Sequence, residues 1–481
     1  MLFNSIDFAI FLPIVFLLYW FATKGSLKLQ NILLLVASYF FYGCWDWRFL
    51  FLLIFSTGLD YFTGLKMFDA NSLRMKKFWF WLSIGVNLGF LGVFKYYNFF
   101  ISSFAEALSQ VGVQANYSTL QVILPVGISF YTFHGLSYVI DIYKSRIEPE
   151  RNFIHYSVFV CFFPLLVAGP IERATHLLPQ ITRKREFDYD KAVDGLRQIL
   201  WGLFKKLVIA DNCATYVNQI FNSYHTQSGS TLFVAAIFFA FQIYCDFSGY
   251  SDIALGTARL FGIELLRNFA FPYFSRDIAE FWRRWHISLT TWFRDYLYIP
   301  LGGSRGSKLH VIRNTFIIFL VSGFWHGANW TFLAWGALHA LLFLPLILLG
   351  RNRYNTNMVA EGRFLPNLKE IFQMGSTFFL VVIAWVFFRA NTIGQAVDYL
   401  GRIMNKSFFQ TPILLNRQFY IPLILSVFVL LLTEWIQRNK KHGLELIGIK
   451  YTWFRWSLYF VILYAIVSFG GSEQQFIYFQ F

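Results

Sequence analysis

Long hydrophobic runs, separated by short polar loops, make up most of this sequence. A helix needs about 17–25 apolar residues to span a membrane, and we therefore expect about 11–13 transmembrane or re-entrant helices. The shorter and more polar runs are the ones expected to be re-entrant. The runs lie near residues 8–22, 29–43, 49–66, 78–101, 119–143, 154–170, 196–220, 230–262, 311–326, 329–350, 371–388, 419–436 and 453–470.

The composition agrees with a membrane protein and excludes several other classes. Hydrophobic residues make up 57% of the 481 residues, charged residues 14%, and the mean hydropathy is +0.49. Soluble domains carry about 25% charged residues, so a soluble, disordered or coiled-coil chain is excluded. Because backbone groups inside lipid must bond within the protein, the sequence predicts an all-α polytopic protein. No linker divides it, and we expect one transmembrane domain over residues 1–481.

The net charge of +15 arises from 41 Lys and Arg against 26 Asp and Glu. These basic residues lie in short loops, which is typical of topology signals and lipid-headgroup contacts and argues against nucleic-acid binding. The basic stretch 267–313 should be cytoplasmic, and the loop 102–118, which has no Lys or Arg, should lie outside. This assignment places both chain ends outside. The first run lacks a signal-peptide pattern, so we expect it to remain as a membrane helix.

Several kinds of chemistry are missing from the sequence. HExxH and GK[ST] motifs are absent, which excludes zincin metalloproteases and P-loop enzymes. The cysteines stand far apart and form no CxxC, so we expect neither a disulfide framework nor a metal site. They are Cys44, Cys161, Cys213 and Cys245.

The segment Phe281–Gly303 combines charges with aromatic residues. One helical face carries Phe281, Trp285, Leu289 and Trp292. A charge at the centre of a spanning helix costs roughly 2.5–3.5 kcal/mol, so the spacing predicts an amphipathic helix at the membrane interface. One interpretation is an interfacial anchor. The other is a basic face that binds phosphates through Arg283, Arg284 and Arg294, with His286 inside a polar cleft. Asp295 is a further candidate for binding the donor or substrate.

A second histidine lies at membrane depth. His326 follows Arg313 by 13 residues, which at about 1.5 Å per residue places it roughly 20 Å into the bilayer. An ionisable group there indicates function, and histidine suits proton transfer near neutral pH. The alternative is a buried histidine bonded to a carbonyl. If His326 is catalytic, either as a general base or transiently as a nucleophile, the amide of Asn329 or the indole of Trp325 can stabilise an oxyanion.

Two further regions are candidates for the same site. The C-terminus, Phe476–Phe481, is either an aromatic belt at the interface or an inserted tail whose Tyr478 hydroxyl takes part in group transfer. The polar side chains of the run 242–256 either orient the histidines or hold helices together. They are Asp246, Ser248 and Asp252.

Five motifs in this order and spacing resemble the membrane-bound O-acyltransferase (MBOAT) family over nearly the whole chain. Within that family the sequence is most similar to the bacterial branch of alginate and peptidoglycan O-acetyltransferases. The motifs are LPVGISFYTF, FPLLVAGPIER, CDFSGYSDIALG, FWRRWHISLTTWFRDYLYIPLGG and FWHGANWTFLAWG.

The resemblance implies a fold and a reaction. The fold is a ring of helices around a central pore, and the protein belongs in a bacterial inner membrane. The family's invariant histidine corresponds to His326, its second histidine to His286, and a tail tyrosine that carries the acyl group to Tyr478. A cytoplasmic thioester, acetyl-CoA or a carrier-protein thioester, is the expected donor. A periplasmic or extracellular transferase partner and a polysaccharide such as alginate or peptidoglycan are the expected acceptors.

Two other functions stay open at this point. One is direct acylation of a lipid, a teichoic acid or a protein, without a relay through the tail. The other is a transporter or flippase without covalent chemistry, although acidic residues in the hydrophobic runs are scarce and no inverted repeat is detectable.

Overall fold

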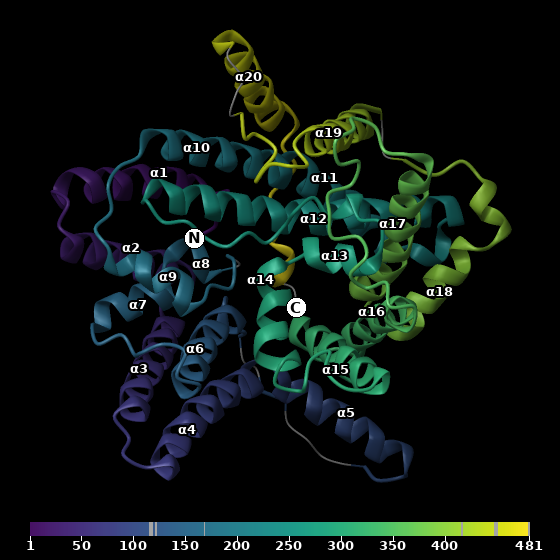
Figure 1. Ribbon diagram of the computed structural model, residues 1–481. Coiled ribbons are helices and arrows are strands. Elements are labelled where there is room, and N and C mark those ends of the chain that lie inside the picture. The colour runs from purple at the N-terminus through teal and green to yellow at the C-terminus, as the bar shows by residue number, and fades with distance from the viewer. Residues whose placement is uncertain (115–118, 121–122, 168, 415–416, 447–450, 480–481) are drawn as a thin grey trace. The chain divides into compact units, whose positions relative to one another are not determined.

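The computed structural model describes residues 1–481 except 115–118, 121–122, 168, 415–416, 447–450 and 480–481. The described residues form helices and no strands, which confirms the predicted all-α class (Figure 1). Contacts along the chain divide it into two compact units. The first unit comprises residues 1–192 and 257–266, and the second comprises residues 193–256 and 267–481.

The first unit contains the N-terminal helices. Short π-helical turns continue α1 to Ala22 and join α4 to α5. The helices are α1 (Ile6–Leu17), α2 (Leu27–Asp46), α3 (Arg48–Phe68), α4 (Leu73–Leu91), α5 (Tyr97–Gln110), α6 (Ile128–Tyr143), α7 (Phe153–Cys161), α8 (Phe163–Leu166), α9 (Ala174–Thr182) and the start of α10 (Tyr189–Leu203).

The second unit contains most of α10, all of α11, most of α12, and all the helices that follow α12. A π-helical segment, Phe204–Ala210, joins α10 to α11, and a single 3-10 turn, Ile477–Phe479, ends the described chain. The helices are α11 (Asp211–Asn222), α12 (Gly229–Leu260), α13 (Ile278–Arg284), α14 (Ile287–Phe293), α15 (Lys308–His326), α16 (Trp330–Leu348), α17 (Leu368–Arg389), α18 (Ile393–Ile403), α19 (Arg417–Ile436) and α20 (Thr452–Phe469).

Eight helices of the described chain are long and apolar enough to cross a membrane, which fits a polytopic protein. They are α2, α3, the continuous stretch Leu73–Gln110, α12, α16, α17, most of α19, and α20. The other predicted runs form shorter or less apolar helices. The run near 154–170 folds as α7 and α8, which are separated at Phe162. Part of this run and part of the run near 119–143 lie outside the described residues.

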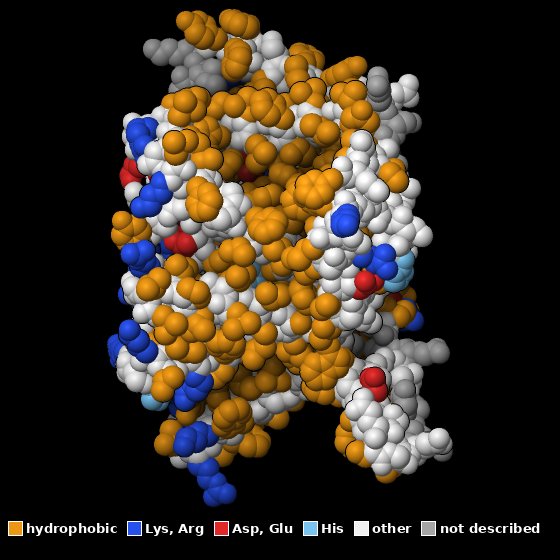
Figure 2. All heavy atoms as spheres, turned by 90° about the vertical axis from the view of Figure 1, so that its right-hand side faces the viewer, with side chains coloured by type: hydrophobic (Ala, Val, Ile, Leu, Met, Phe, Trp, Pro, Cys, Tyr) orange, Lys and Arg blue, Asp and Glu red, His pale blue; other side chains and the backbone are white. Residues whose placement is uncertain are grey.

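Hydrophobic side chains cover much of the outside of these helices. Figure 2 shows them gathered over the face that it draws. Leu341 on α16, Phe372 on α17 and Val467 on α20 are 53%, 77% and 85% exposed. Lipid tails solvate such side chains well, whereas water does not. The exposed apolar surface therefore follows from the membrane location of the chain.

Glycines bring α15 and α16 close together and so position the end of α15. A Cβ atom at Gly323 would lie 2.2 Å from the carbonyl oxygen of Phe332, and one at Gly336 would lie 2.3 Å from that of Phe319. Small residues at a helix interface allow backbones to approach in this way. Asn329 then starts α16 by accepting a hydrogen bond from the N–H of Thr331 at 3.0 Å. The chain thus turns sharply just after α15.

Candidate active site

His326 is the last residue of α15, and aromatic side chains surround it. Its ring centroid lies 5.1 Å from that of Trp335, 5.3 Å from that of Phe388 and 5.0 Å from that of Trp325. The side chain is 4% exposed. The C-terminus of a helix carries partial negative charge, which favours the imidazolium that forms when a histidine takes up a proton. The position therefore suits a general base.

The segment predicted as one amphipathic helix is broken at His286, so that prediction is wrong. His286 separates α13 from α14 and has φ = 42°, in the left-handed region that non-glycine residues rarely adopt. The N–H of Ile287 donates to the carbonyl of Asn268 at 2.9 Å. Asn268 is itself fixed, because its amide oxygen accepts from Ser288 at 2.6 Å and its amide group donates to Ser251 at 3.1 Å.

The break leaves His286 buried among aromatic rings. Its ring centroid lies 4.7 Å from that of Phe247 and 6.1 Å from that of Trp325. Neither ring nitrogen has a hydrogen-bond partner among the described residues. His286 lies outside the eight candidate spans, and burial lowers its pKa below the usual range. The imidazole is therefore neutral at neutral pH.

The C-terminal tail brings Tyr478 to both histidines. In Figure 1 the yellow C-terminal end lies beside α14. The ring centroid of Tyr478 is 5.6 Å from that of His326, 6.4 Å from that of His286 and 6.4 Å from that of Trp325. Its hydroxyl is buried and has no hydrogen-bond partner among the described residues. Gln480 and Phe481, which belong to the predicted tail, lie outside those residues.

Four side chains predicted from separate motifs therefore form one cluster. They come from the α13–α14 break, the end of α15 and the tail, and they are His286, Trp325, His326 and Tyr478. The hydroxyl of Tyr478 and the ring nitrogens of His286 have no hydrogen-bond partner among the described residues, and such buried polar groups call for an explanation, such as a catalytic role. A hydroxyl next to a neutral imidazole and a second histidine is an arrangement for nucleophilic and general-base chemistry. Among the described residues, no group of acidic, His or Cys side chains gathers to hold a metal ion.

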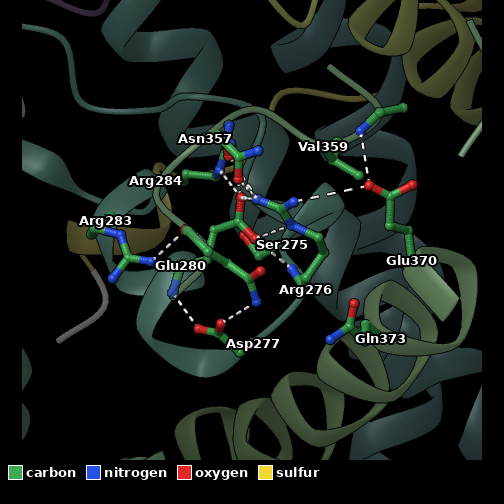
Figure 3. Close-up of polar contacts among 12 residues, drawn as sticks. Ser275, Arg276, Asp277, Glu280, Arg283, Arg284, Asn357, Val359, Glu370 and Gln373 are labelled. Atoms are coloured by element: carbon green, nitrogen blue, oxygen red, sulfur yellow. Dashed lines mark hydrogen bonds and ion pairs between the residues drawn. The ribbon is translucent and has the colours of Figure 1, made fainter. Parts of the chain in front are cut away.

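The predicted basic residues of α13 belong to a paired network (Figure 3). Glu280 accepts from the side chains of Arg276 at 3.0 and 3.2 Å and of Arg284 at 2.9 and 3.1 Å. Glu280 is 1% exposed. Arg276 also donates to the carbonyl of Asn357 at 2.6 Å and lies 3.9 Å from Glu370. The charge of Arg284 is thus already neutralised inside the protein.

Arg283 and Arg294 differ from Arg284, because both are exposed and line a cavity of about 560 Å³. Arg283 donates to the carbonyls of Asn352 and Asn355 at 3.0 and 2.6 Å. Arg294 pairs with Asp295 at 2.7 Å. The cavity also reaches Ser322 of α15, one helical turn before His326 and on the same face.

The side chain of Asn329 forms structural hydrogen bonds. Its amide oxygen caps α16, and its amide nitrogen donates to the carbonyl of Asn391 at 3.0 Å. Both ends of the amide are engaged, so an oxyanion role for Asn329 stays a prediction that the structure does not support. The indole of Trp335 was not predicted. Its N–H is buried beside His326 and has no hydrogen-bond partner among the described residues.

The acidic residues of α12 bind lysines. Asp246 lies 2.8 Å from the ammonium of Lys206, and Asp252 lies 2.6 Å from that of Lys205, which also donates to Ser248 at 2.9 Å. These contacts support the second interpretation of the run 242–256, in which the polar groups hold the structure together. The two lysines were missed, although charges of opposite sign in two predicted membrane runs are a signal that the runs pair.

Comparison with known proteins places these residues in context. The sequence model of a family described as "MBOAT, membrane-bound O-acyltransferase family" matches residues 145–388. That region contains both histidines and ends before the tail.

Curated relatives extend over more of the chain. A protein of Pseudomonas aeruginosa named probable alginate O-acetylase AlgI is 41% identical over 398 residues, which are 82% of this chain and 73% of that protein. A peptidoglycan O-acetyltransferase of Helicobacter pylori is 36% identical over 429 residues, covering 83% and 79% of the two chains. A teichoic acid D-alanyltransferase of Streptococcus thermophilus is 29% identical over 260 residues, covering 50% and 62%.

Proposed function

Because the chain belongs to the membrane-bound O-acyltransferase family, we propose that it carries an acetyl group from a cytoplasmic thioester to Tyr478 and on to an extracytoplasmic polysaccharide. The family makes it a multi-pass membrane O-acyltransferase. The observation that carries the proposal is the buried hydroxyl of Tyr478 in the cluster with His326 and His286.

The cavity lined by Arg283 and Arg294 is the proposed donor site. Arginine side chains bind phosphate groups through charge-assisted hydrogen bonds, and acetyl-CoA carries phosphates far from its thioester. Arg353 adds a third positive charge to the lining. The rest of the lining is mostly apolar, as the pantetheine arm of acetyl-CoA or of a carrier-protein thioester requires. The thioester end then lies toward Ser322 and His326.

In the first step, Tyr478 is the nucleophile. His326 takes the proton from the hydroxyl, the phenolate oxygen attacks the thioester carbonyl, and the C–S bond breaks. The leaving thiolate takes the proton from His326 and departs as a thiol. The indole N–H of Trp325 or Trp335 donates to the oxyanion, and neutral His286 positions the donor.

In the second step, a hydroxyl of the acceptor attacks the acyl ester on Tyr478. The acceptor's proton passes to the phenolate, which restores the tyrosine. A periplasmic or extracellular partner transferase presents the polysaccharide, with the protein in the bacterial inner membrane and both chain ends outside. The names of the relatives support alginate or peptidoglycan as acceptor classes.

The walls around His326 favour a short acyl group. Trp335 and Phe388 lie within 5.1 and 5.3 Å of its ring centroid, and large aromatic side chains leave little room for a long chain. An acetyl group fits this requirement better than a fatty acyl group.

The test uses purified protein in liposomes with isotope-labelled acetyl-CoA, beside a His326→Ala control. We expect thioester loss that vanishes in the control. A carrier-protein thioester and the partner protein are added in turn if acetyl-CoA alone gives no reaction. Absence of thioester loss with every donor would contradict acyl transfer and favour a transporter. Deleting Phe476–Phe481 separates the relay from direct acylation of a lipid, teichoic acid or protein, because a direct enzyme keeps its activity.

A further inference from the structure

A buried ion cluster, which the proposed chemistry does not use, holds the backbone of the C-terminal tail. The ammonium of Lys206 lies 2.8 Å from Asp211 and 2.8 Å from Asp246, and it donates to the carbonyl of Gln474 at 3.1 Å. The other oxygen of Asp246 accepts from the N–H of Ile477 at 2.7 Å. The three charged residues are only 1–5% exposed: Lys206 5%, Asp211 1% and Asp246 3%.

The tail supplies two of the hydrogen bonds of the cluster. Lys206 donates hydrogen bonds to Asp211 and to the tail carbonyl of Gln474, and its ammonium forms an ion pair with Asp246. One cation faces two carboxylates, so the N–H of Ile477 supplies a further positive dipole to Asp246. A buried carboxylate oxygen without such a donor is costly. The cluster and the tail therefore stabilise each other.

The cluster forms hydrogen bonds with backbone atoms on both sides of Phe476. The two points are the carbonyl of residue 474 and the N–H of Ile477, which directly precedes Tyr478. Between them, the ring of Phe476 packs 4.8 Å from that of Tyr250 and is 2% exposed. The orientation of the tyrosine thus depends on a rigid attachment one residue away.

The tail is also fixed where it begins. The N–H of Gly471 donates to the carbonyl of Leu207 at 2.9 Å, and the amide of Asn212 donates to the carbonyl of Phe469 at 2.8 Å. A Cβ atom at Gly471 would lie 3.0 Å from the backbone nitrogen of Asn212. Both ends of the stretch 471–478 are therefore attached to the same part of the second unit.

A neighbouring ion pair provides a contrast. Lys205 precedes Lys206 in the π-helical segment Phe204–Ala210, and its hydrogen-bond acceptors Ser248 and Asp252 both belong to α12. π-helical turns inside helices are frequent at functional sites. In this segment, Lys205 donates hydrogen bonds to α12. Lys206 forms an ion pair with Asp246 of α12 and donates to the tail.

We propose that Lys206 and Asp246 form a positioning pair that holds the hydroxyl of Tyr478 in place for acyl transfer. The proposal rests on the relay described under Proposed function. A nucleophile must be held close to its productive geometry, and a misplacement of about 1 Å can cost roughly 100-fold in rate. The pair does not touch the donor cavity, so its effect falls on the transfer step.

The first test compares transfer rates. Asp246→Ala removes the acceptor of the Ile477 N–H, and we expect kcat for Tyr478 acylation to fall roughly 100-fold with the KM for the thioester unchanged. Asp246→Asn keeps one acceptor and should retain an intermediate rate. Asp252→Ala, the matched control in the neighbouring pair, should leave kcat unchanged. Equal losses in Asp246→Ala and Asp252→Ala, or a rise in KM alone, would overturn the proposal.

The second test needs no enzyme activity. Cys44 is the only exposed cysteine among the described residues, so the background is Cys44→Ser with Tyr478→Cys, alkylated by a maleimide in liposomes. Alkylation requires local opening of the tail. Adding Asp246→Ala should raise its rate about 10- to 100-fold, the factor that corresponds to losing one buried hydrogen bond. Adding Asp252→Ala should not.

A further variant tests the backbone contact itself. Ile477→Pro removes the N–H that Asp246 accepts, at the first residue of a 3-10 turn where proline is tolerated, and replaces the buried isoleucine side chain with the smaller proline ring. It should raise alkylation as Asp246→Ala does, even if the latter fails to fold. No increase in either variant overturns the positioning pair. An increase together with full acyl transfer by Tyr478→Phe supports the pair and contradicts the relay.

Discussion

Two buried polar regions of the second unit differ in how their groups are used. Around Glu280, carboxylate oxygens accept from two arginines, and Arg276 bonds further to the loop after α16. Around His326, the polar atoms include the hydroxyl of Tyr478 and both ring nitrogens of His286, which have no hydrogen-bond partner among the described residues. Paired charges build structure, and groups left for a substrate perform chemistry. We therefore assign the Glu280 network to the scaffold and propose the His326 cluster as the site.

The largest effect is expected at the centre of the aromatic cluster. His326→Ala removes the proposed general base, and we expect acyl transfer to fall about 10²- to 10⁴-fold. Because the ring is buried among aromatic side chains, its removal also leaves a cavity, so the transfer rate is compared per folded molecule. Initial rates and unfolding curves on the same preparation provide the check. A variant that unfolds without a specific rate loss would place His326 in the scaffold.

Glu280→Gln tests whether the network around Glu280 stabilises the fold. It leaves Arg276 and Arg284 without their shared negative partner, and removing one partner of a buried pair costs about 3–5 kcal/mol of unfolding free energy. Asp398→Asn is the matched control, because Asp398 pairs with Arg402 at 3.0 Å but is 44% exposed, and exposed pairs contribute about 0–1 kcal/mol. Denaturant titration in detergent measures both. Full stability with abolished transfer would mean that the network belongs to the chemistry.

Arg283 and Arg284 are neighbours at the end of α13, and they allow the same comparison within one helix. Arg283→Gln should raise the KM for the thioester roughly 10-fold, because a hydrogen bond to a charged group contributes about 1.5–3 kcal/mol, while kcat changes little. Arg284→Gln should instead lower stability, since Arg284 is bonded to Glu280 at 2.9 Å. Steady-state kinetics with acetyl-CoA and unfolding measurements separate the two. The reverse pattern would mean that phosphates bind elsewhere.

The smallest effect is expected at Asn329. Asn329→Ala removes the N-cap of α16 and should cost about 1 kcal/mol of unfolding free energy, with the transfer rate per folded molecule unchanged. Asn329→Ser, which restores a capping oxygen, should recover the stability. A rate loss in both variants at full stability would return Asn329 to the oxyanion role that the sequence suggested.

The sequence predicted many of the membrane helices and pointed to the side chains that meet in the aromatic cluster, because most of them leave a local signal. Hydrophobic runs mark α2, α3 and α16, and His326 stands out as an ionisable residue deep in an apolar stretch. The tail tyrosine was found through a family resemblance. These signals depend on neighbours in the sequence.

Features that depend on distant contacts were not predictable. The break at His286 requires Asn268 to accept from Ile287, and nothing in the spacing of the aromatic residues reports that bond. The pairing of Lys206 with Asp246 joins residues that lie in different hydrophobic runs. Only the three-dimensional structure shows which partner each charge finds.

The most direct test of the account is rapid quenching of the wild-type protein after mixing with labelled acetyl-CoA, followed by peptide mapping of the C-terminus. The account predicts label on Tyr478 that appears at least as fast as turnover, and no label in His326→Ala. Tyr478→Phe should lose transfer while keeping its fold. Full transfer to the acceptor by Tyr478→Phe, or label that appears more slowly than turnover, would contradict the account.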